Sequence, residues 1–356
     1  MRLHRTLLTA VLILSICSAS GLSEPAYADT LASKQAQADR VAHQIDSLNN
    51  RAEIYAERYN QARVRYEAVS ADVVVAKRKV AKIQKKMSYQ QGHLDTRVSE
   101  MYRSGPLNFL EVLLSVRDFD VFESTIRVLT DLNDRDAALV SGLKDLKAQA
   151  KKAQAVLVAK QNDARTHKNE MASAEAEVKT QLAARKHLLA SLAADIQKLL
   201  AKQLASQGSS QQGRTMAMLM RTRTASSGGI TFGGAQAPNA KAAEAVYWAE
   251  RQIGKPYVWA AAGPDTFDCS GLMLWSYAHV GINLNHYSGD QINEGKHVSR
   301  GDLAPGDLVF FGSPIHHVGM YVGGDNFVEA PFTGENVRIA RFSNRGDFAG
   351  ACRPSE

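Results

Sequence analysis

One cysteine in the C-terminal third of the chain stands where a thiol nucleophile would be most reactive. Cys269 lies in the segment Phe267–Gly271, where a loop gives way to an apolar stretch with helical periodicity. A thiol in the first turn of a helix faces the positive end of the helix dipole, which stabilises the thiolate that attacks carbonyl carbons. Backbone N–H groups at that helix end can hold the oxyanion that such an attack produces. A buried structural cysteine would fit the same position, so position alone leaves both interpretations open.

A cysteine nucleophile needs a base within hydrogen-bond reach and a partner that orients this base. Gly323-Gly324 separates two apolar runs and predicts a β-hairpin. If the turn centres on Gly323, His317 faces Glu329, and the period of two along a strand places both side chains on one face. The carboxylate would then accept from one ring nitrogen and leave the other directed at Cys269. A bulge of one residue would break this pairing.

The neighbouring His316 is the alternative base. In a strand, His316 lies on the same face as Val318, Met320 and Val322, and we expect this apolar face to pack inward. His317 lies on the opposite face, together with Gly319. The same register pairs Gly319 with Phe327, and a glycine there would leave space above the strand for a substrate. We therefore assign His317 as the base. Adjacent strand residues point to opposite faces, so the two histidines do not form a chelating pair, and we expect no metal and no cofactor.

Two long stretches with a heptad repeat precede this region. Small and apolar residues recur every 3.5 positions from 38 to 87, and a second periodic stretch covers 132–204. Such repeats specify coiled-coil seams with charged residues on the flanks, so we expect an antiparallel helical hairpin over residues 29–205. The Gly105-Pro106 step ends the first helix, because proline lacks a backbone donor and clashes with the preceding turn.

The tip of this hairpin, around residues 104–131, is too apolar for a plain loop. We expect short helices there that pack on the end of the hairpin. Two interpretations of the tip stay open, namely a self-contained cap and an apolar face that binds a partner.

The first 28 residues have the parts of an export signal. A basic start precedes an apolar run over 7–19, and small residues at 26 and 28 form a cleavage site. The run is short for a membrane span, so we expect cleavage after Ala28 and a secreted protein. Lipidation at Cys17 is an alternative that the bulky preceding residue disfavours. Cys269 and Cys352 then remain, and a disulfide between them would silence the thiol.

The rest of the chain divides into a tether and a globular region. Residues 206–240 are rich in Gly, Ser, Gln and Thr, a composition typical of a flexible linker. Over 241–356 we expect helices near 241–253 and 269–280, followed by strands near 307–311, 317–322, 326–330 and 337–342. Helices first and an antiparallel sheet afterwards is an α+β pattern.

The formal net charge of +7 raises the question of a nucleic-acid partner. The basic residues are scattered through helices of alternating charge rather than gathered in a patch. Export also removes the protein from most nucleic acids. We therefore expect no nucleic-acid binding and attribute the charge to attraction toward an anionic cell envelope.

Four blocks in the C-terminal region, in this order, resemble the NlpC/p60 family of cell-wall peptidases. They are Gly254–Trp259, Asp268–Leu272, Leu303–Phe311 and His317–Val322. The resemblance implies a papain-like cysteine peptidase that hydrolyses peptidoglycan stem peptides, commonly at the bond between D-glutamate and the diamino acid. It also implies that Cys269, His317 and Glu329 form the catalytic triad, although the third position varies in the family.

The resemblance further implies that Tyr257, Asp268, Ser270 and Ser288 line the substrate pocket. The chain departs from the family pattern in two places. Two alanines at 260–261 replace the usual pair of glycines, which adds methyl groups beside the pocket. Asn285-His286 stands where proline and arginine are frequent, which puts recognition of the end of the substrate in doubt.

The predicted hairpin is similar to the coiled-coil domains of peptidoglycan hydrolases used in cell separation. That similarity implies a cell-wall-associated enzyme whose hairpin tip docks on a membrane complex of the division machinery. Because a freely active wall hydrolase endangers its producer, we also expect autoinhibition by the N-terminal region. The competing hypothesis is a scaffold or activator in which the C-terminal domain grips wall peptides without cleaving them.

Overall fold

The computed structural model describes residues 25–104, 116, 118–206 and 237–355. The chain forms two compact units, one of residues up to 64 together with 170–356, and one of residues 65–169. Most of the predicted export signal and linker lies outside the described residues, as do 105–115 and 117 of the predicted tip. Among the described residues, no helix is long and apolar enough to cross a membrane.

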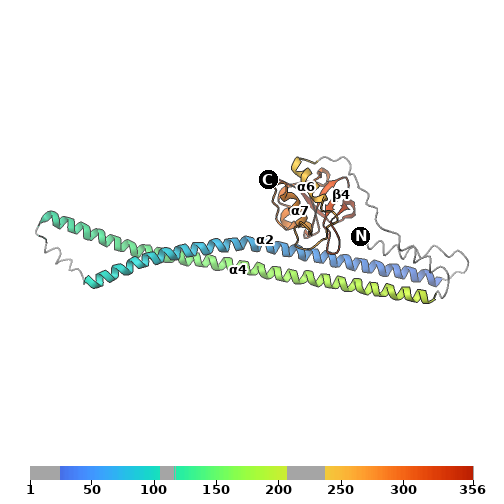
Figure 1. Ribbon diagram of the computed structural model, residues 1–356, viewed down its shortest axis with the longest axis horizontal. Helices are drawn as coiled ribbons and strands as arrows, with labels where there is room; N and C mark the ends of the chain where they lie inside the picture. The colour runs from blue at the N-terminus through green and yellow to red at the C-terminus, as the bar shows by residue number, and fades with distance from the viewer. Residues whose placement is uncertain (1–24, 105–115, 117, 207–236, 356) are drawn as a thin grey trace. The chain divides into compact units, whose positions relative to one another are not determined.

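Two long helices account for the N-terminal half, α2 (Pro25–Ser104) and α4 (Phe119–Ser206), as Figure 1 shows. Within the 65–169 unit, Lys160 Nζ lies 2.8 Å from Asp72 and Arg97 Nε lies 3.1 Å from Asp136. Lys160 lies closer to the C-terminal end of α4 than Asp136, and its partner Asp72 lies closer to the N-terminal end of α2 than Arg97. The two helices therefore run antiparallel. Small and branched side chains form the seam, and they are Ala76, Val80, Ile83, Leu146, Ala153 and Leu157. The predicted antiparallel hairpin is confirmed.

The prediction of short helices packed at the tip is wrong for residues 119–131, which form the first turns of α4. Asp118 explains the continuous helix, because its Oδ1 accepts from the backbone N–H of Asp120 at 2.9 Å and satisfies a free helix donor. Phe119 is 77% exposed and Val128 is 65% exposed, so these side chains do not cap the hairpin.

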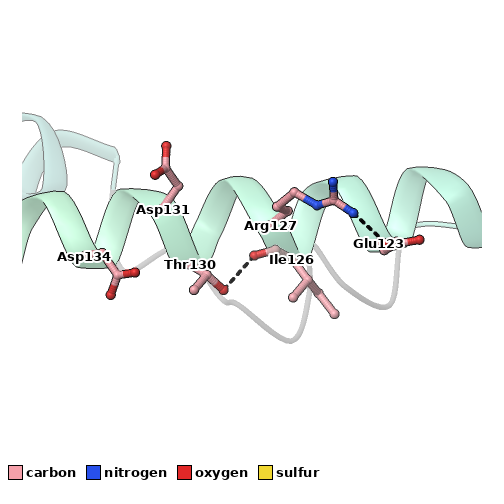
Figure 2. Close-up of a pocket in the computed structure, with 6 residues that line it drawn as sticks. All are labelled: Glu123, Ile126, Arg127, Thr130, Asp131 and Asp134. Carbon is pink, nitrogen blue, oxygen red and sulfur yellow. Dashed lines mark hydrogen bonds and ion pairs between the residues drawn. The ribbon is translucent and has the colours of Figure 1, made fainter.

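A shallow hollow runs along this stretch of α4 (Figure 2) and is lined by Glu123, Ile126, Arg127, Thr130, Asp131 and Asp134. The spacing of three and four places these six residues on one face of a single helix. Arg127 donates to Glu123 at 2.6 Å, and the Thr130 hydroxyl donates to the Ile126 carbonyl. The six side chains include no thiol and no imidazole, so this hollow is not the site predicted from the sequence.

The C-terminal region is α+β, as predicted. It contains three α-helices, α6 (Ala240–Glu250), α7 (Cys269–Ala278) and α8 (Ser288–Gln291), and two 3₁₀ turns, η2 (Arg300–Asp302) and η3 (Phe342–Asn344). Its strands are β1 (Gly295–His297), β2 (Leu308–Phe311), β3 (His317–Gly323), β4 (Asn326–Glu329), β5 (Arg338–Arg341) and β6 (Phe348–Pro354).

These six strands form one antiparallel sheet in the order β1-β6-β2-β3-β4-β5. Strand β2 is buried on both faces, with Leu308 and Phe310 in one cluster and Val309 and Phe311 in the other. The first cluster contains Leu272 of α7, so that helix covers one face of the sheet. An unbroken apolar run is therefore what this strand requires.

The register between β3 and β4 differs from the predicted one by two residues. Phe327 pairs with Tyr321, where the sequence predicted Gly319, and the ladder shifts before the Gly323–Asn326 pair. The reason is the turn, which lies beyond Gly323, since both Gly323 and Gly324 adopt the left-handed backbone region that favours glycine. A shift by an even number keeps each side chain on its predicted face.

Candidate active site

Cys269 occupies the first position of α7, as predicted. Asp268 is the N-cap, and its Oδ1 accepts from the backbone N–H of Gly271 at 2.6 Å. A side chain at Gly271 would collide with the carbonyl oxygen of Ala261, so only glycine fits at this position in the first turn of α7. Cys269 and Cys352 are both free and buried, so the disulfide considered from the sequence is not formed.

His317 and Glu329 make the hydrogen bond predicted for them. Nε2 of His317 lies 2.9 Å from Oε2 of Glu329, and both side chains are buried. Arg338 donates to the other oxygen, Oε1, at 2.9 Å from its position opposite Glu329 on β5. Burial alone would raise the pKa of Glu329, but the hydrogen bond and charge of His317, with the charge of Arg338, lower it to about 2. The carboxylate is therefore a permanent negative charge behind the imidazole.

The second ring nitrogen of His317, Nδ1, is buried and has no hydrogen-bond partner among the described residues. Burial lowers the pKa of His317, so the ring is neutral near pH 7 and can accept a proton. His316 has a different environment, because its Nδ1 lies 2.7 Å from the Pro314 carbonyl oxygen and its ring packs over Gly312. The carboxylate partner therefore belongs to His317, in agreement with the assignment made from strand parity.

The expectation that Gly319 leaves space for a substrate is wrong. A side chain there would meet the ring of Phe327 at 2.5 Å and the Val328 carbonyl oxygen at 2.8 Å. The glycine instead permits the close approach of β4. The aromatic rings of Phe311 and Phe327 lie on this face, with the Phe311 ring centroid 6.0 Å from that of His317.

Four residues were predicted to line the pocket, and the structure places three of them together. Asp268, Ser270 and Ser288 surround one carboxylate, that of Glu57 in α2. Gln291 fixes this arrangement, because its Nε2 donates to the carbonyl oxygen of Ser270 at 2.9 Å. The fourth residue, Tyr257, is buried. Its pKa is raised well above the usual range by burial and by the nearby acidic groups of Cys269 and Asp268.

The two departures from the family pattern each have a structural consequence. His286 Nε2 lies 2.8 Å from Asp268 Oδ1, and Asp268 has a lowered pKa because the charge and hydrogen bond of His286 outweigh burial. His286 therefore supplies a buried hydrogen-bond partner of Asp268. Ala260 has a φ of 60°, a left-handed conformation that costs an alanine about 1 kcal/mol and a glycine almost nothing. The glycine usual at this position relieves that strain.

Comparison with known proteins finds similarity in this region of the chain. Residues 254–347 match the model of the NlpC/P60 family. The chain is 42% identical over 109 residues to peptidoglycan endopeptidase RipA of Mycolicibacterium smegmatis, an alignment that covers 27% of this chain and 22% of RipA. It is 43% identical over 91 residues to probable endopeptidase p60 of Listeria grayi, covering 25% and 18%. The NlpC/p60 domain of peptidoglycan hydrolase SagA, a solved structure, is 33% identical, with 31% of this chain and 97% of that chain covered and a TM-score of 0.30.

Residues 254–347 form a domain of the NlpC/P60 family. The match is confined to the C-terminal domain, and the chain spans about a fifth of the length of the RipA and p60 relatives.

The site of this NlpC/P60 domain contains residues that the sequence analysis did not single out, and they come from α2. Glu53, Glu57 and Asn60 follow one another at helical spacing, and Glu57 and Asn60 are buried. The seam pattern assigned this stretch to the coiled coil alone. The sequence contains one sign of these residues, a stripe of polar residues on α2 that begins at Asn49. Packing between two helices does not require such a stripe, so it could have indicated a third partner for α2.

The thiol of Cys269 is less acidic than the sequence predicted, because of its burial and of the carboxyl groups around it. The helix dipole predicts a lowered pKa for Cys269, but its pKa is raised well above the usual range by burial, by Glu57 and by Asp268. The thiol proton points toward Glu57 Oε1, which lies 3.8 Å from Sγ. Cys269 is therefore an uncharged thiol in this arrangement.

Proposed function

We propose that the chain is an exported cysteine endopeptidase that cleaves peptidoglycan stem peptides. The observation that carries this proposal is the buried hydrogen bond between His317 and Glu329. It leaves Nδ1 of the imidazole without a hydrogen-bond partner among the described residues, beside Glu53, whose charge also acts on Cys269. A thiol, a neutral imidazole and a fixed carboxylate are the groups needed for acyl transfer. The predicted export signal and the family likeness support a cell-wall location and a role in wall remodelling or daughter-cell separation.

In the proposed reaction, Nδ1 of His317 takes the proton of Cys269 while Sγ bonds to the carbonyl carbon of the stem peptide. Glu329 stabilises the imidazolium that results. Backbone N–H groups of the first turn of α7 hold the oxyanion. The C–N bond breaks as the imidazolium returns its proton to the leaving amine. Water then hydrolyses the thioester, with His317 again acting as the base.

The residues around Glu57 support a specific bond. Its carboxylate stands in for a substrate carboxylate, and it is held by the backbone N–H of Ser288 at 2.5 Å, the Ser288 hydroxyl at 2.6 Å and the Ser270 hydroxyl at 2.8 Å. A glutamyl residue cleaved at its side-chain carbonyl keeps a free carboxylate that would fit this serine cradle, which we define as Ser270 and Ser288. We therefore propose cleavage between D-glutamate and the diamino acid.

A digest of defined muropeptides, read by mass spectrometry, tests this function. We expect products that end in D-glutamate, and we expect Cys269→Ala and His317→Ala to abolish them. Glu329→Gln should retain reduced activity, because the amide still orients the ring but does not stabilise its charge. An alkylating reagent should stop the reaction and a chelator should not. Intact muropeptides that bind the protein without being cleaved, also after Glu57→Ala has emptied the serine cradle, would favour the scaffold hypothesis.

A further inference from the structure

One face of α2 between Glu53 and Arg63 is built to fit the catalytic domain. Its polar side chains lie at helical spacing, and two of them are buried far more deeply than polar residues on a coiled coil usually are, since Asn60 is 0% and Glu57 is 2% exposed. Burying a carboxylate is costly unless hydrogen bonds compensate for the lost hydration. The compensation for Glu57 comes mostly from the catalytic domain, so this face of α2 is matched to that domain.

The Glu57 carboxylate occupies the serine cradle with both of its oxygens. Oε2 accepts from the backbone N–H and the hydroxyl of Ser288, and Oε1 accepts from the hydroxyl of Ser270. Asn60 donates at 3.0 Å both to Oε1 of Glu57 and to Oδ2 of Asp268, which joins the helix to the N-cap of α7. These are the donors expected around a bound ligand carboxylate.

Further contacts hold α2 on the domain in the two turns that follow Glu57. The ring of Tyr59 meets that of Trp259 edge to face at 5.0 Å between centroids. Arg63 donates to the carbonyl oxygen of Ala260 at 3.2 Å and contacts Nδ1 of His286. Together with the hydrogen bond from Gln61 to the Tyr287 hydroxyl, these contacts fix the register of α2 on the domain.

The helix α4 also contacts the domain, on the segment that follows the triad carboxylate. Arg185 donates to the carbonyl oxygen of Thr333, and its guanidinium lies 5.4 Å from the ring centroid of Phe332. Both long helices therefore contact the domain.

We propose that α2 is an internal pseudosubstrate, in which Glu57 occupies the carboxylate position of the stem peptide and blocks Cys269. The mimicry rests on the proposed peptidase function. The block has two parts, because Glu57 fills the cradle that a substrate needs and its negative charge opposes ionisation of the thiol. Activity then requires displacement of α2 from the domain.

Glu57→Ala in the full chain from residue 29 tests the pseudosubstrate, with Glu67→Ala, an exposed glutamate of the same helix, as the matched control. The first measurement is the rate at which iodoacetamide alkylates Cys269, followed by peptide mass spectrometry. Cys352, which is buried with a pKa raised to about 12, reports whether the fold is intact. We expect Glu57→Ala to accelerate alkylation of Cys269 about tenfold or more, as expected for the loss of hydrogen bonds to a charged group.

Glu57→Gln is the second variant, because it preserves the shape of the side chain. One oxygen of the carboxylate becomes an NH₂ group that faces donors of Ser288 or Asn60, so this variant should also accelerate alkylation. Cleavage of muropeptides is measured in parallel. Faster alkylation without cleavage would support the block and overturn the proposed peptidase. Alkylation at the rate of the unsubstituted chain in both Glu57 variants would overturn the block, whatever the cleavage result.

Discussion

Oε2 of Glu53 lies 3.6 Å from Nδ1 of His317, on the side of the imidazole opposite its bond to Glu329. Glu53 stands one helical turn before Glu57, so two neighbouring carboxyl groups of α2 lie in the site, one near the base and one near the nucleophile. The first makes no hydrogen bond to the histidine at this distance, whereas the second is held by several donors. The two carboxyl groups should therefore contribute unequally to the block.

Glu53→Ala should accelerate alkylation of Cys269 by a smaller factor than Glu57→Ala, about two- to threefold, since it removes charge but no hydrogen bond to the domain. The measurement is the same alkylation rate in the full chain. An effect of Glu53→Ala equal to that of Glu57→Ala would show that the block depends on bulk and charge rather than on the serine cradle.

The contact of α2 with the domain should weaken as pH rises. Burial and the charge of Asp268 raise the pKa of Glu57, and burial raises that of Glu53 well above its usual range. When α2 leaves the site, both groups return to ordinary values. The contact is then favoured below about pH 4.5 and loses stability as pH rises through the raised pKa values. The ionisable groups around this pair are Tyr257, Asp268, Cys269, His286, His317, Glu329, Arg345 and Asp347.

The measurement is the alkylation rate of Glu57→Gln divided by that of the unsubstituted chain, between pH 5 and pH 8. The division removes the ordinary ionisation of the thiol, which both proteins share. We expect the ratio to fall several-fold across this range. A ratio that rises with pH would show that the contact prefers ionised carboxyl groups.

Glu329 should make the catalytic domain sensitive to acid. Its pKa of about 2 lies below the usual value of 4.5, so its ionised form stabilises the fold. That stability is fully present above about pH 4.5 and is lost as pH falls toward 2, by about 3 kcal/mol in total. Glu329→Gln should flatten the decline in the free energy of unfolding over this range, as measured by urea denaturation. Arg338→Met should flatten it partly, because Arg338 is one of several groups that lower the pKa.

Ala260→Gly should stabilise the domain, because it removes the strain of an alanine at a φ of 60°. The gain is about 0.5 kcal/mol after the greater chain entropy of glycine in the unfolded state is subtracted. Ala243→Gly, on an exposed helical position in α6, is the matched control and should destabilise by about 1 kcal/mol. Thermal unfolding of both variants checks the prediction, and a lower melting temperature for Ala260→Gly would contradict it.

The parts of the fold that depend on local pattern were predictable from the sequence. The heptad repeats gave the antiparallel helices, and the glycine pair gave the β3–β4 hairpin with His317 and Glu329 on one face. The register itself was wrong by two residues, because the position of the turn depends on backbone conformation at Gly323 and Gly324. His317 and Glu329 still lie on the same face of the sheet, because the register error was an even number of residues.

The strands β1 and β6 were not predicted, because their sequences are short, polar or rich in small residues and pair only in the context of the sheet. The residues that contact Glu329, Asp268 and Cys269 were not predicted for a similar reason. Arg338, His286 and Glu57 reach it from segments that are distant in sequence, and no local periodicity connects them. The polar stripe on α2 can be recognised in the sequence, but the apolar seam beside it is sufficient to predict a long helix, so the stripe was not interpreted separately.

The position of Glu57 in the serine cradle has a kinetic consequence. A carboxylate that belongs to the same chain competes with substrate at an effective concentration set by its tether, on the order of millimolar or higher for short connections, and dilution of the protein does not reduce it. Soluble stem peptides at low concentration would displace it poorly. A force or a binding event that separates α2 from the domain would remove this competition for as long as the two stay apart. The enzyme would then respond to force or binding at its helices rather than to the local concentration of substrate.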